Sequence, residues 1–379
     1  MFAGAGGLGI GLHRAGFHPV NVIEWDAYCC DTILRNKLRK VRAVKGWNVT
    51  QGDVREVDFR QYEDAVELVS GGPPCQPFSL GGKHRAHDDR RDMFPQAIRA
   101  VREARPKAFV FENVKGLTRA SFRNYYEYIR LQMEHPEISQ RVDEDWSDHL
   151  ARLEQHHMSG SRDGLNYRVV RHLVNAADYG VPQRRERVFF VGFREDLGVR
   201  WSFPTPTHSQ SALLLDQEIG IYWDRHNIPK RERVETKRAS RHVREGAVKL
   251  QAWQTVRDAL FDLPDPEHHP ELSGDFPDHR FQPGARSYAG HTGSPLDEPA
   301  KTLKAGVHGV PGGENMLLRA DGSVRYFSVR ESARLQTFPD DYRFQGSWSE
   351  TMRQLGNAVP VALAEFVGND VARYLREVA

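Results

Sequence analysis

The sequence predicts an α/β fold in which short strands alternate with helices around a mostly parallel sheet. Four short apolar runs are typical of buried strands, at 20–23, 65–69, 108–111 and 187–191. Three stretches between them have helical patterning, at 27–38, 94–104 and 163–174. The alternation favours parallel pairing, because consecutive parallel strands need a crossover connection that a helix supplies.

Length and composition narrow the class of protein. The 379 residues exceed the ~250–300 residues at which one core stops growing, so we expect more than one domain. Hydrophobic residues make up 39% and charged residues 27%, which is typical of a globular chain and excludes a fibre. No apolar run approaches the about 20 residues of a membrane span, so we expect a cytoplasmic protein without a membrane partner.

The composition changes at about residue 200 and again near residue 326. Beyond the first point the chain is rich in Pro, Arg and His, and residues 225–249 carry nine Lys and Arg against three Glu. The whole chain has a formal charge of only +2, so the average conceals this basic segment. Residues 361–367 are again amphipathic and helical. We expect three parts: a core at 1–199, a second domain at 200–325 and a return to the core at 326–379.

A glycine-rich loop opens the chain. Gly4-Ala-Gly6-Gly7-Leu-Gly9 fits GxGxxG and precedes a predicted helix from Ile10 to Ala15, a pattern that lets a ligand approach the backbone closely. Glu24 and Trp25 follow the next strand, where a carboxylate can bind ribose hydroxyls and an indole can lie against a purine. Asp53 follows a third element and can accept from an adenine amino group. The combination predicts an adenosine-containing cofactor.

A second loop carries the candidate nucleophile. Cys75 lies in Gly71-Gly-Pro-Pro-Cys75-Gln-Pro-Phe-Ser79, directly after an apolar strand, and three prolines stiffen the segment. A thiolate on a rigid loop at a sheet edge is suited to nucleophilic attack. The glycines and cations of 81–91 suit a loop that closes over a polyanion. Cys29 and Cys30 are expected to pack in the core instead.

Disulfides and metals are not expected. Three cysteines, two of them adjacent, are too few for a disulfide framework, which favours a reducing cytoplasm. The chain has neither a CxxC nor an HExxH spacing, so the sequence predicts no metal site.

Taken together, these motifs resemble those of the DNA (cytosine-5-)-methyltransferase family, in the style of bacterial type II restriction–modification enzymes. Matching segments follow one another along nearly the whole chain except its middle: 2–7, 24–25, 53–54, Pro73-Pro-Cys-Gln76, Phe111-Glu-Asn-Val114, Gln183-Arg-Arg-Glu-Arg187, 330–336 and 356–360. The resemblance implies a class I S-adenosylmethionine-dependent methyltransferase fold, Rossmann-like, with an inserted target-recognition domain at 200–325.

The resemblance also implies the roles of individual residues. It assigns S-adenosyl-L-methionine contacts to Phe2, Gly4, Gly6, Gly7, Leu8, Glu24, Trp25, Asp53, Val54, Pro73, Asn357 and Val359. It assigns contacts with the reacting cytosine to Cys75, Glu112, Arg187 and Arg185. For Arg185 the alternative is a structural role. It implies double-stranded DNA as substrate, and we expect DNA contacts from Lys83, Arg85, Thr302 and Leu303. We also expect a restriction endonuclease that acts on the same DNA site, and we expect the enzyme to be a monomer.

The chemistry explains why these residue types are needed. Addition of the Cys75 thiolate to C6 of cytosine makes C5 nucleophilic enough to take a methyl group. Electrons move toward N3 during this addition, so an acid with a raised pKa, Glu112, lowers the barrier. Arg187 can hold the cytosine O2, and water can take the C5 proton before Cys75 leaves. Because a paired base cannot reach Cys75, we expect the target cytosine to be flipped out of the duplex.

Three features depart from the family pattern. The chain starts at the glycine loop, so the hypothesis is that a strand precedes Met1 in the full protein. Gly81 stands where many relatives have a polar residue that enters the gap left by the flipped base. The segment 119–160 is longer than the compact pattern and is expected to be a helical insertion.

Three alternatives stay open. The RNA branch of the same family shares the Cys75 and Glu112 chemistry, although the basic insert and the lack of a Cys-Phe-Thr segment near residue 330 favour DNA. A Rossmann dehydrogenase explains only the glycine loop. A non-catalytic DNA-binding relative is disfavoured by the intact Cys75, Glu112 and Arg187.

Overall fold

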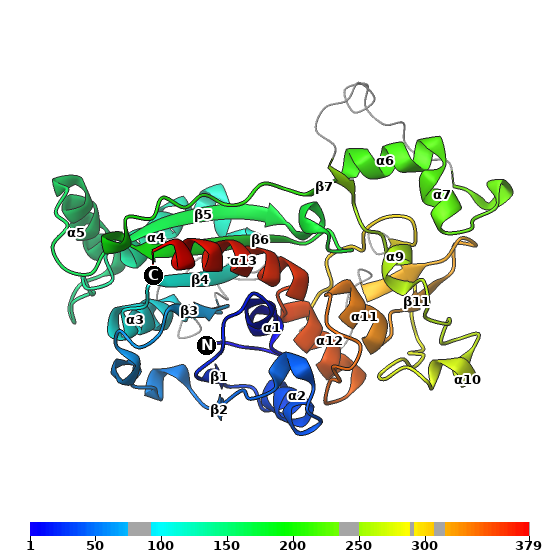
Figure 1. Ribbon diagram of the computed structural model, residues 1–379, viewed down its shortest axis with the longest axis horizontal. Coiled ribbons are helices and arrows are strands. Elements are labelled where there is room, and N and C mark those ends of the chain that lie inside the picture. Colours follow the sequence, from blue (N-terminus) through cyan, green and yellow to red (C-terminus); the bar gives the residue numbers. More distant parts are fainter. Residues whose placement is uncertain (75–91, 235–249, 289–291, 307–314, 379) are drawn as a thin grey trace.

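The structure is a computed structural model that describes residues 1–74, 92–234, 250–288, 292–306 and 315–378 (Figure 1). Its largest sheet has four strands in the order β3-β4-β6-β5. Their bounds are β3 Leu68–Gly71, β4 Ala108–Val114, β5 Tyr167–Asn175 and β6 Glu186–Arg194. β3 and β4 run parallel, whereas β6 is antiparallel to both β4 and β5. The predicted α/β class is therefore confirmed, with an antiparallel hairpin at one edge of the sheet.

A smaller sheet pairs β1 (Val22–Glu24) with β2 (Val49–Gln51) in parallel. The first three residues lie between the two sheets. The amino group of Met1 donates to the carbonyl of Ser70 at 2.9 Å, and the Ala3 N–H donates to the carbonyl of Ile23 at 3.4 Å. Because Ser70 belongs to β3 and Ile23 to β1, residues 1–3 connect the two sheets.

The helix predicted over 163–174 is wrong, because this segment forms β5. Its pattern contains three valines, Val169, Val170 and Val174, whose branched side chains pack well on a pleated surface. Among the described residues β5 has only β6 as a neighbour, and both of its faces are partly exposed. An edge strand of this kind lacks the strict alternation that identifies a half-buried strand, so a helical interpretation competes with it.

Four helices agree with the predictions. α2 (Ala27–Leu38) and α3 (Phe94–Ala104) have the predicted bounds, and α1 (Gly7–Arg14) and α13 (Val361–Glu377) cover the predicted segments. α13 runs along the sheet beside α1 (Figure 1). The approach is close: a Cβ at Gly7 would lie 2.3 Å from the carbonyl oxygen of Val359, and one at Gly11 would lie 2.4 Å from the Cβ of Ala364. Only glycine permits this packing.

The insertion at 119–160 is helical, as predicted. It contains α4 (Arg123–Glu134) and α5 (Trp146–Ser159), which pack together at one end of the molecule (Figure 1). The Tyr128 hydroxyl and Nδ1 of His149 share a 2.8 Å hydrogen bond between the two helices. Asp145 begins α5 by accepting from the backbone N–H groups of Ser147 and Asp148.

The segment that follows the core strands holds short elements, several of which lie beyond the end of the sheet (Figure 1). They are β7 His208–Ser209, α6 Gln210–Ile219, α7 Ile221–Arg225, β8 Gln251–Ala252, α9 Val256–Leu260, α10 Pro270–Ser273, β9 Ser294–Pro295, β10 Met316–Leu318 and β11 Val324–Tyr326. α11 (Val329–Leu335) and α12 (Trp348–Asn357) then lead back to α13. Short 3₁₀ turns are η1 Arg42–Val44, η2 Val54–Glu56, η3 Phe59–Tyr62, η5 Lys115–Thr118, η6 Ala120–Phe122, η7 Ala176–Tyr179, η8 Glu195–Leu197 and η9 Lys230–Glu232.

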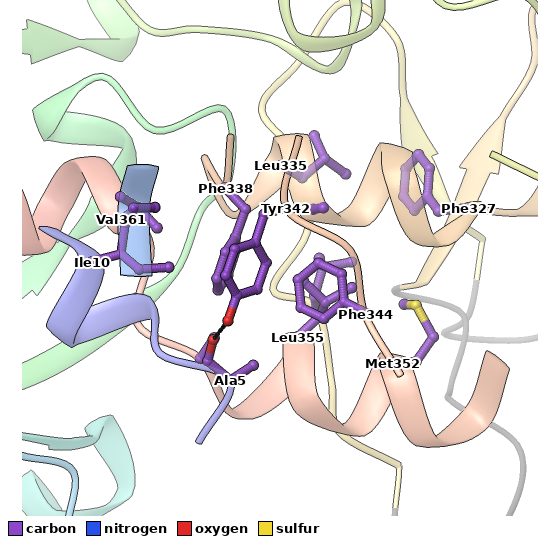
Figure 2. Packing of buried hydrophobic residues seen from close by; sticks show 14 of the residues in the cluster. Ala5, Ile10, Phe327, Leu335, Phe338, Tyr342, Phe344, Met352, Leu355 and Val361 are labelled. Atoms are coloured by element: carbon purple, nitrogen blue, oxygen red, sulfur yellow. Dashed lines mark hydrogen bonds between the residues drawn. The ribbon is translucent and has the colours of Figure 1, made fainter. Parts of the chain in front are cut away.

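One apolar cluster joins the start of the chain to its last third (Figure 2). Ile10 of α1 lies in it with Phe338, Leu355 and Val361, and the Tyr342 hydroxyl donates to the carbonyl of Ala5 at 2.8 Å. Leu303 and Leu317 belong to the same cluster, so part of the 200–325 segment shares the central core. Within the described residues, no helix is long and apolar enough to cross a membrane.

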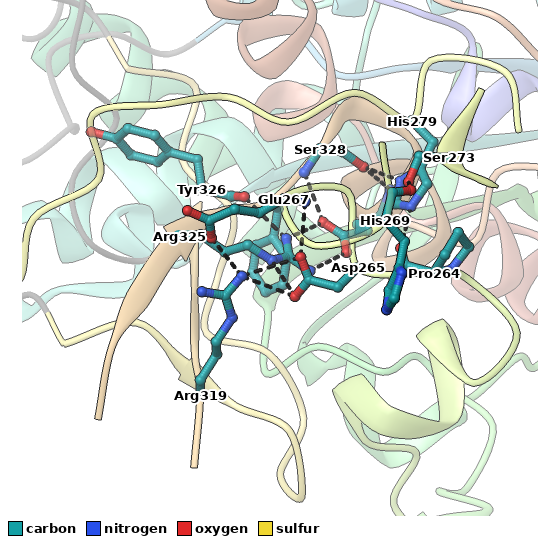
Figure 3. Close-up of polar contacts among 12 residues, drawn as sticks. Pro264, Asp265, Glu267, His269, Ser273, His279, Arg319, Arg325, Tyr326 and Ser328 are labelled. Atoms are coloured by element: carbon teal, nitrogen blue, oxygen red, sulfur yellow. Dashed lines mark hydrogen bonds and ion pairs between the residues drawn. The ribbon is translucent and has the colours of Figure 1, made fainter. Parts of the chain in front are cut away.

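A polar cluster holds the β10–β11 hairpin against α11 (Figure 3). Asp265 accepts from Arg319 at 3.0 Å and from Arg325 at 3.2 Å. Arg325 also makes two 2.7 Å hydrogen bonds to the two carboxylate oxygens of Glu331 in α11, and both side chains are almost fully buried. A bidentate pair of this kind fixes orientation, so the hairpin is held in a defined position.

Candidate active site

Two charged side chains meet at one end of the central sheet. Glu112 is near the end of β4 and pairs in register with Phe189 of β6, so Arg187 is its diagonal neighbour on the same face. Nε of Arg187 lies 2.8 Å from Oε1 of Glu112. The side chains are only 12% and 9% exposed, respectively, so the pair is shielded from water. The predicted acid and the predicted cytosine-binding arginine are thus brought together.

Burial decides the protonation behaviour of Glu112. Desolvation raises the pKa of its carboxyl above the ordinary value, and the charges of Arg187 and Arg185 only partly oppose this effect. A carboxyl with a raised pKa keeps its proton more readily, which is what a general acid at a ring nitrogen requires. The second oxygen faces the cysteine loop, because a Cβ at Gly72 would lie 3.4 Å from Oε2 of Glu112.

Arg185 holds three distant segments together. It is fully buried, and its guanidinium donates to the carbonyls of Leu303 at 3.1 Å, Gly356 at 2.7 Å and Ala358 at 2.8 Å. Its Nε has no hydrogen-bond partner within the part of the chain that the structure describes. These contacts favour the structural alternative, in which Arg185 positions the strand that carries Arg187. Its direct contact with a base stays a prediction.

Thr302 and Leu303 also bind the arginine segment. The Thr302 hydroxyl donates to the carbonyl of Arg184 at 2.7 Å, and the Leu303 N–H donates to Oε1 of Gln183 at 3.0 Å. The Leu303 side chain is 1% exposed and lies in the central apolar cluster. The Leu303 side chain therefore packs in the core and does not face outward, and the predicted DNA contact of this residue stays a prediction. Thr302 is half-buried.

The base of the cysteine loop is well defined. Pro73 is buried, and its carbonyl accepts from Nδ2 of Asn113 at 2.9 Å. The carbonyl of Pro74 accepts from the Met93 N–H at 3.1 Å, which joins the two ends of the segment 75–91. Asn113 thus anchors the residues directly before Cys75, and it follows Glu112 in the sequence. Cys75, Lys83, Arg85 and Gly81 lie outside the described residues.

The glycine loop and the first strand form the candidate cofactor side. The Glu24 carboxylate accepts from the Gly4 N–H at 2.7 Å and from the Asp26 N–H at 2.8 Å. The Gly52 N–H donates to the carbonyl of Glu24 at 2.9 Å, which brings the loop after β2 alongside. Each carboxylate oxygen retains another lone pair that can accept from a hydroxyl.

Of two further predicted residues on this side, Trp25 is exposed and Asp53 is partly buried. The Trp25 indole is 67% exposed, which is unusual for a large aromatic side chain and leaves its face free for a planar ligand. Asp53 begins η2 by accepting from the Arg55 N–H at 2.9 Å and pairs with the Arg55 guanidinium at 2.8 Å. That pairing lowers the pKa of Asp53, so the group is an anion. An exposed ring, two carboxylates and a glycine loop fit an adenosine-containing cofactor.

The remaining predicted cofactor residues differ in exposure. Asn357 is exposed, whereas Val54, Leu8 and Val359 are buried in apolar clusters. Phe2 is half-buried at a φ of 50°, and Gly4 and Gly6 have φ values of 54° and 92°. A Cβ at Gly4 would meet nothing within 4 Å, so the loop is open at that point. The backbones of these residues line the loop even where their side chains pack inward.

Cys29 and Cys30 are packing residues, as predicted. Their exposures are 4% and 1%, and neither forms a disulfide. Burial raises the pKa of the Cys30 thiol to about 12, which suppresses the thiolate at neutral pH. Neither residue is suited to nucleophilic attack, which leaves Cys75 as the candidate.

One positioning residue was not singled out from the sequence. Gln183 is fully buried; its Nε2 donates to the carbonyl of Leu335 at 3.2 Å, and its Oε1 accepts from Leu303. It therefore connects the arginine segment to α11. The available signal was its place at the start of the 183–187 motif, but an amide followed by four charged residues suggests an exposed position.

Solved structures identify the class of fold. The Dnmt2 methyltransferase of S. pombe aligns with a TM-score of 0.56 and 16% identity over 100% of this chain and 97% of its own. The methyltransferase EhMeth of Entamoeba histolytica aligns with a TM-score of 0.54 and 13% identity over 99% and 96%. At these identities the likeness concerns the fold, which is that of class I methyltransferases.

The chain belongs to the C-5 cytosine-specific DNA methylase family, which matches residues 1–136 and 151–373. It is therefore a methyltransferase. The type II methyltransferase M.NgoMIV of Neisseria gonorrhoeae is 32% identical over 99% of this chain and 96% of its own length. M.PspPI of a Psychrobacter strain is 31% identical over 99% and 78%. The family match omits residues 137–150, which hold most of the connection between α4 and α5 and the first residues of α5.

Proposed function

We propose that this methyltransferase transfers a methyl group from S-adenosyl-L-methionine to C5 of a cytosine flipped out of a specific duplex DNA sequence, through a covalent bond between Cys75 and C6. The observation that carries the proposal is the buried Glu112–Arg187 pair, 2.8 Å apart, beside the backbone that leads into Cys75. An acid and a fixed cation in a dry site are what the polarised pyrimidine ring requires.

The proposed steps use residues of this chain in turn. The Cys75 thiolate adds to C6 while Glu112 gives its proton to N3, and Arg187 binds O2. When bound, the sulfonium cofactor supplies the methyl group that C5 attacks. The C5 proton then passes to water, Cys75 is eliminated, and N3 returns its proton to Glu112. Asn113 and Pro73 fix the approach of the cysteine loop through their 2.9 Å hydrogen bond.

The cofactor assignment is supported by the arrangement around Glu24. We propose that Glu24 accepts from the ribose hydroxyls, that Trp25 lies against the adenine and that Asp53 accepts from its amino group. The exposure of Trp25, 67%, and the open space at Gly4 support this arrangement. The half-buried and buried residues Phe2, Leu8, Val54 and Val359 shape the pocket from behind, with Asn357 at its rim.

DNA recognition is assigned to the segment 200–325, between a catalytic part at 1–199 and a C-terminal part at 326–379. A small apolar cluster brings together Leu213, Tyr222, Trp223 and Trp253 of this segment and joins them to Ala177 of the catalytic part. The +6 charge of 225–249 suits phosphate contacts. Lys83, Arg85 and Thr302 are proposed to contact the DNA near the flipped base.

The cellular setting follows from the relatives. Because M.NgoMIV and M.PspPI carry the description type II methyltransferase, we propose that this enzyme belongs to a restriction–modification system with an endonuclease for the same site. A monomer acting in the cytoplasm fits a DNA substrate and the reduced, buried Cys29 and Cys30.

The direct test is transfer of a labelled methyl group to duplex DNA and to tRNA. We expect label on DNA with wild type, none with Cys75→Ser, and unchanged activity with Cys30→Ala as the matched control. Label on tRNA alone would assign the enzyme to the RNA branch. Label on neither polymer contradicts the proposal, provided that the protein binds the cofactor in a separate titration. Bisulfite sequencing of the product then gives the target sequence.

A further inference from the structure

A second cluster of chemically active side chains lies in the helical insertion, at the end of the sheet opposite Glu112. Glu134 and His135 end α4, and His157 lies in the last turn of α5. One oxygen or nitrogen atom from each of the three lies within 4.8 Å of the other two. His135 contacts Asn166, which directly precedes Tyr167, the residue that pairs with Arg194 at the end of β6. Arg187 lies at the other end of β6, so the sheet separates this cluster from the proposed catalytic edge.

The protonation of His135 is fixed by its neighbour Asn166. Nδ2 of Asn166 donates to the carbonyls of Asp163 and Gly164, both at 3.2 Å, which leaves Oδ1 facing His135. Nδ1 of His135 lies 2.7 Å from Oδ1 and therefore donates to it. A neutral His135 ring that donates through Nδ1 carries its lone pair on Nε2.

Three potential ligand atoms face one another. Nε2 of His135 lies 3.1 Å from Nδ1 of His157, and Nδ1 of His157 lies 3.4 Å from Oε2 of Glu134. Glu134 is 8% exposed and gives its other oxygen to Arg130, while Oε2 has no hydrogen-bond partner in the described part of the chain. A single proton on His157 can serve only one of its two neighbours, so one buried lone pair is left without a donor.

We propose that Glu134, His135 and His157 bind a divalent transition-metal ion of the zinc type. Zn²⁺ bonds of about 2.0–2.1 Å in a tetrahedron place neighbouring ligand atoms about 3.3 Å apart, close to the 3.1 Å and 3.4 Å separations here. An ion satisfies all three lone pairs at once. Asn166 supplies the outer hydrogen bond that ligating histidines almost always make.

The site joins α4 to α5 and leaves one coordination position for water. The His157 side chain is 45% exposed, which provides a path for the ion. The sequence predicted no metal site because the ligands are 22 residues apart and follow none of the usual spacings. Only the packing of the two helices brings them together. The metal would stabilise the insertion without taking part in methyl transfer.

The test is metal binding by the full-length chain without a polyhistidine tag. We expect one equivalent of Zn²⁺ to bind, and Co²⁺ at the same site to give the visible absorption of a tetrahedral N/O complex. His157→Gln and Glu134→Gln should each weaken Zn²⁺ binding by at least about 100-fold. His157→Gln is the primary variant because its partly exposed side chain can be replaced without disturbing the fold.

Two controls separate a built site from general histidine binding. His268→Gln removes an exposed histidine elsewhere and should leave the affinity unchanged. His156→Gln removes the ring next to His157, which is outside the cluster, and should also retain binding. The proposal is overturned if wild type binds Zn²⁺ no more tightly than His157→Gln does. It is also overturned if His268→Gln loses as much Zn²⁺ affinity as His157→Gln. Methyl transfer by His157→Gln should equal that of wild type.

Discussion

The two sides of the candidate active site are built differently. On one side, Glu112 and Arg187 project from paired strands, are about nine-tenths buried and already contact each other at 2.8 Å. On the other side, Trp25 follows β1 and its ring is 67% exposed, Asp53 begins η2 and Asn357 ends α12. The first side is organised without substrate, whereas the second presents its groups to a ligand.

This difference indicates that the buried pair determines the rate of the reaction and that the open side determines the affinity for the ligand. A rigid, dry pair fixes the position and pKa of groups that act on the cytosine ring, so changes there should affect the rate of chemistry. Exposed loop residues gain contacts only when a ligand is bound, so changes there should affect affinity.

Replacing the buried acid should have the largest effect. We expect Glu112→Gln to lower kcat by about 10²–10⁴-fold, because the amide cannot give a proton to N3. The affinity for S-adenosyl-L-methionine should be unchanged in a calorimetric titration. Glu67→Gln, an exposed acid that pairs with Lys107, is the control and should be as active as wild type.

The pH profile of the same variant gives an independent check. Burial raises the pKa of Glu112, and the acid is needed in its protonated form. As pH rises through that pKa, the wild-type kcat/KM should fall, and this alkaline limb should be missing in Glu112→Gln. An alkaline limb that persists in the variant would show that another group supplies the proton.

Removing the buried positioning arginine should reduce stability as well as activity. Arg185→Met leaves three buried carbonyls without their donor, and we expect the free energy of unfolding to fall by about 3 kcal/mol or more. Arg184→Met is the matched control, since Arg184 makes a partly exposed pair with Glu298 that contributes at most about 1 kcal/mol. Denaturant unfolding measures both. Equal losses would contradict the structural role of Arg185.

On the open side, Trp25→Ala should weaken cofactor binding with little change in chemistry. Loss of an aromatic stacking partner costs about 1.4 kcal/mol, or roughly tenfold in Kd. The kcat at saturating cofactor should stay within about twofold of wild type, because the ring does not touch the cytosine in this account. Tyr28→Ala removes another half-exposed aromatic ring nearby and should leave Kd unchanged. A fall in kcat alone would remove the distinction between the two sides.

The smallest effect is expected at Asp53. Asp53→Asn loses a charged acceptor for the adenine amino group and should raise the cofactor Kd by about fivefold. Asp58→Asn is a matched control, because Asp58 likewise begins a 3₁₀ turn and pairs with the arginine two residues later at 2.8 Å. If both variants raise Kd equally, the effect comes from the turn and not from a ligand contact.

The sequence predicted the elements whose signals are local. α2 and α3 have the predicted bounds: Asp26 caps the start of α2, and α3 has Pro95 in its first turn and an amphipathic pattern. β5 was predicted as a helix, because an edge strand with both faces partly exposed lacks strict alternation. Local pattern therefore identifies elements in the core better than those at the edge.

The site depends on contacts that no local pattern contains. The motifs named Glu112 and Arg187, but their meeting depends on the antiparallel register of β4 and β6. The hydrogen bonds of Arg185 reach residues 118 to 173 positions away in the sequence. The Glu134, His135 and His157 cluster depends in the same way on the packing of α4 against α5.

The measurement that tests the central claim most directly is covalent trapping of Cys75 on a duplex that contains 5-fluorocytosine. Fluorine replaces the proton that must leave C5, so the adduct formed after methyl transfer persists and can be mapped by mass spectrometry. The account predicts one modified peptide, attached through Cys75, from wild type with S-adenosyl-L-methionine, and far slower formation with Glu112→Gln. An adduct through Cys29 or Cys30, or methylation of normal DNA with no adduct on the fluorinated duplex, would contradict it.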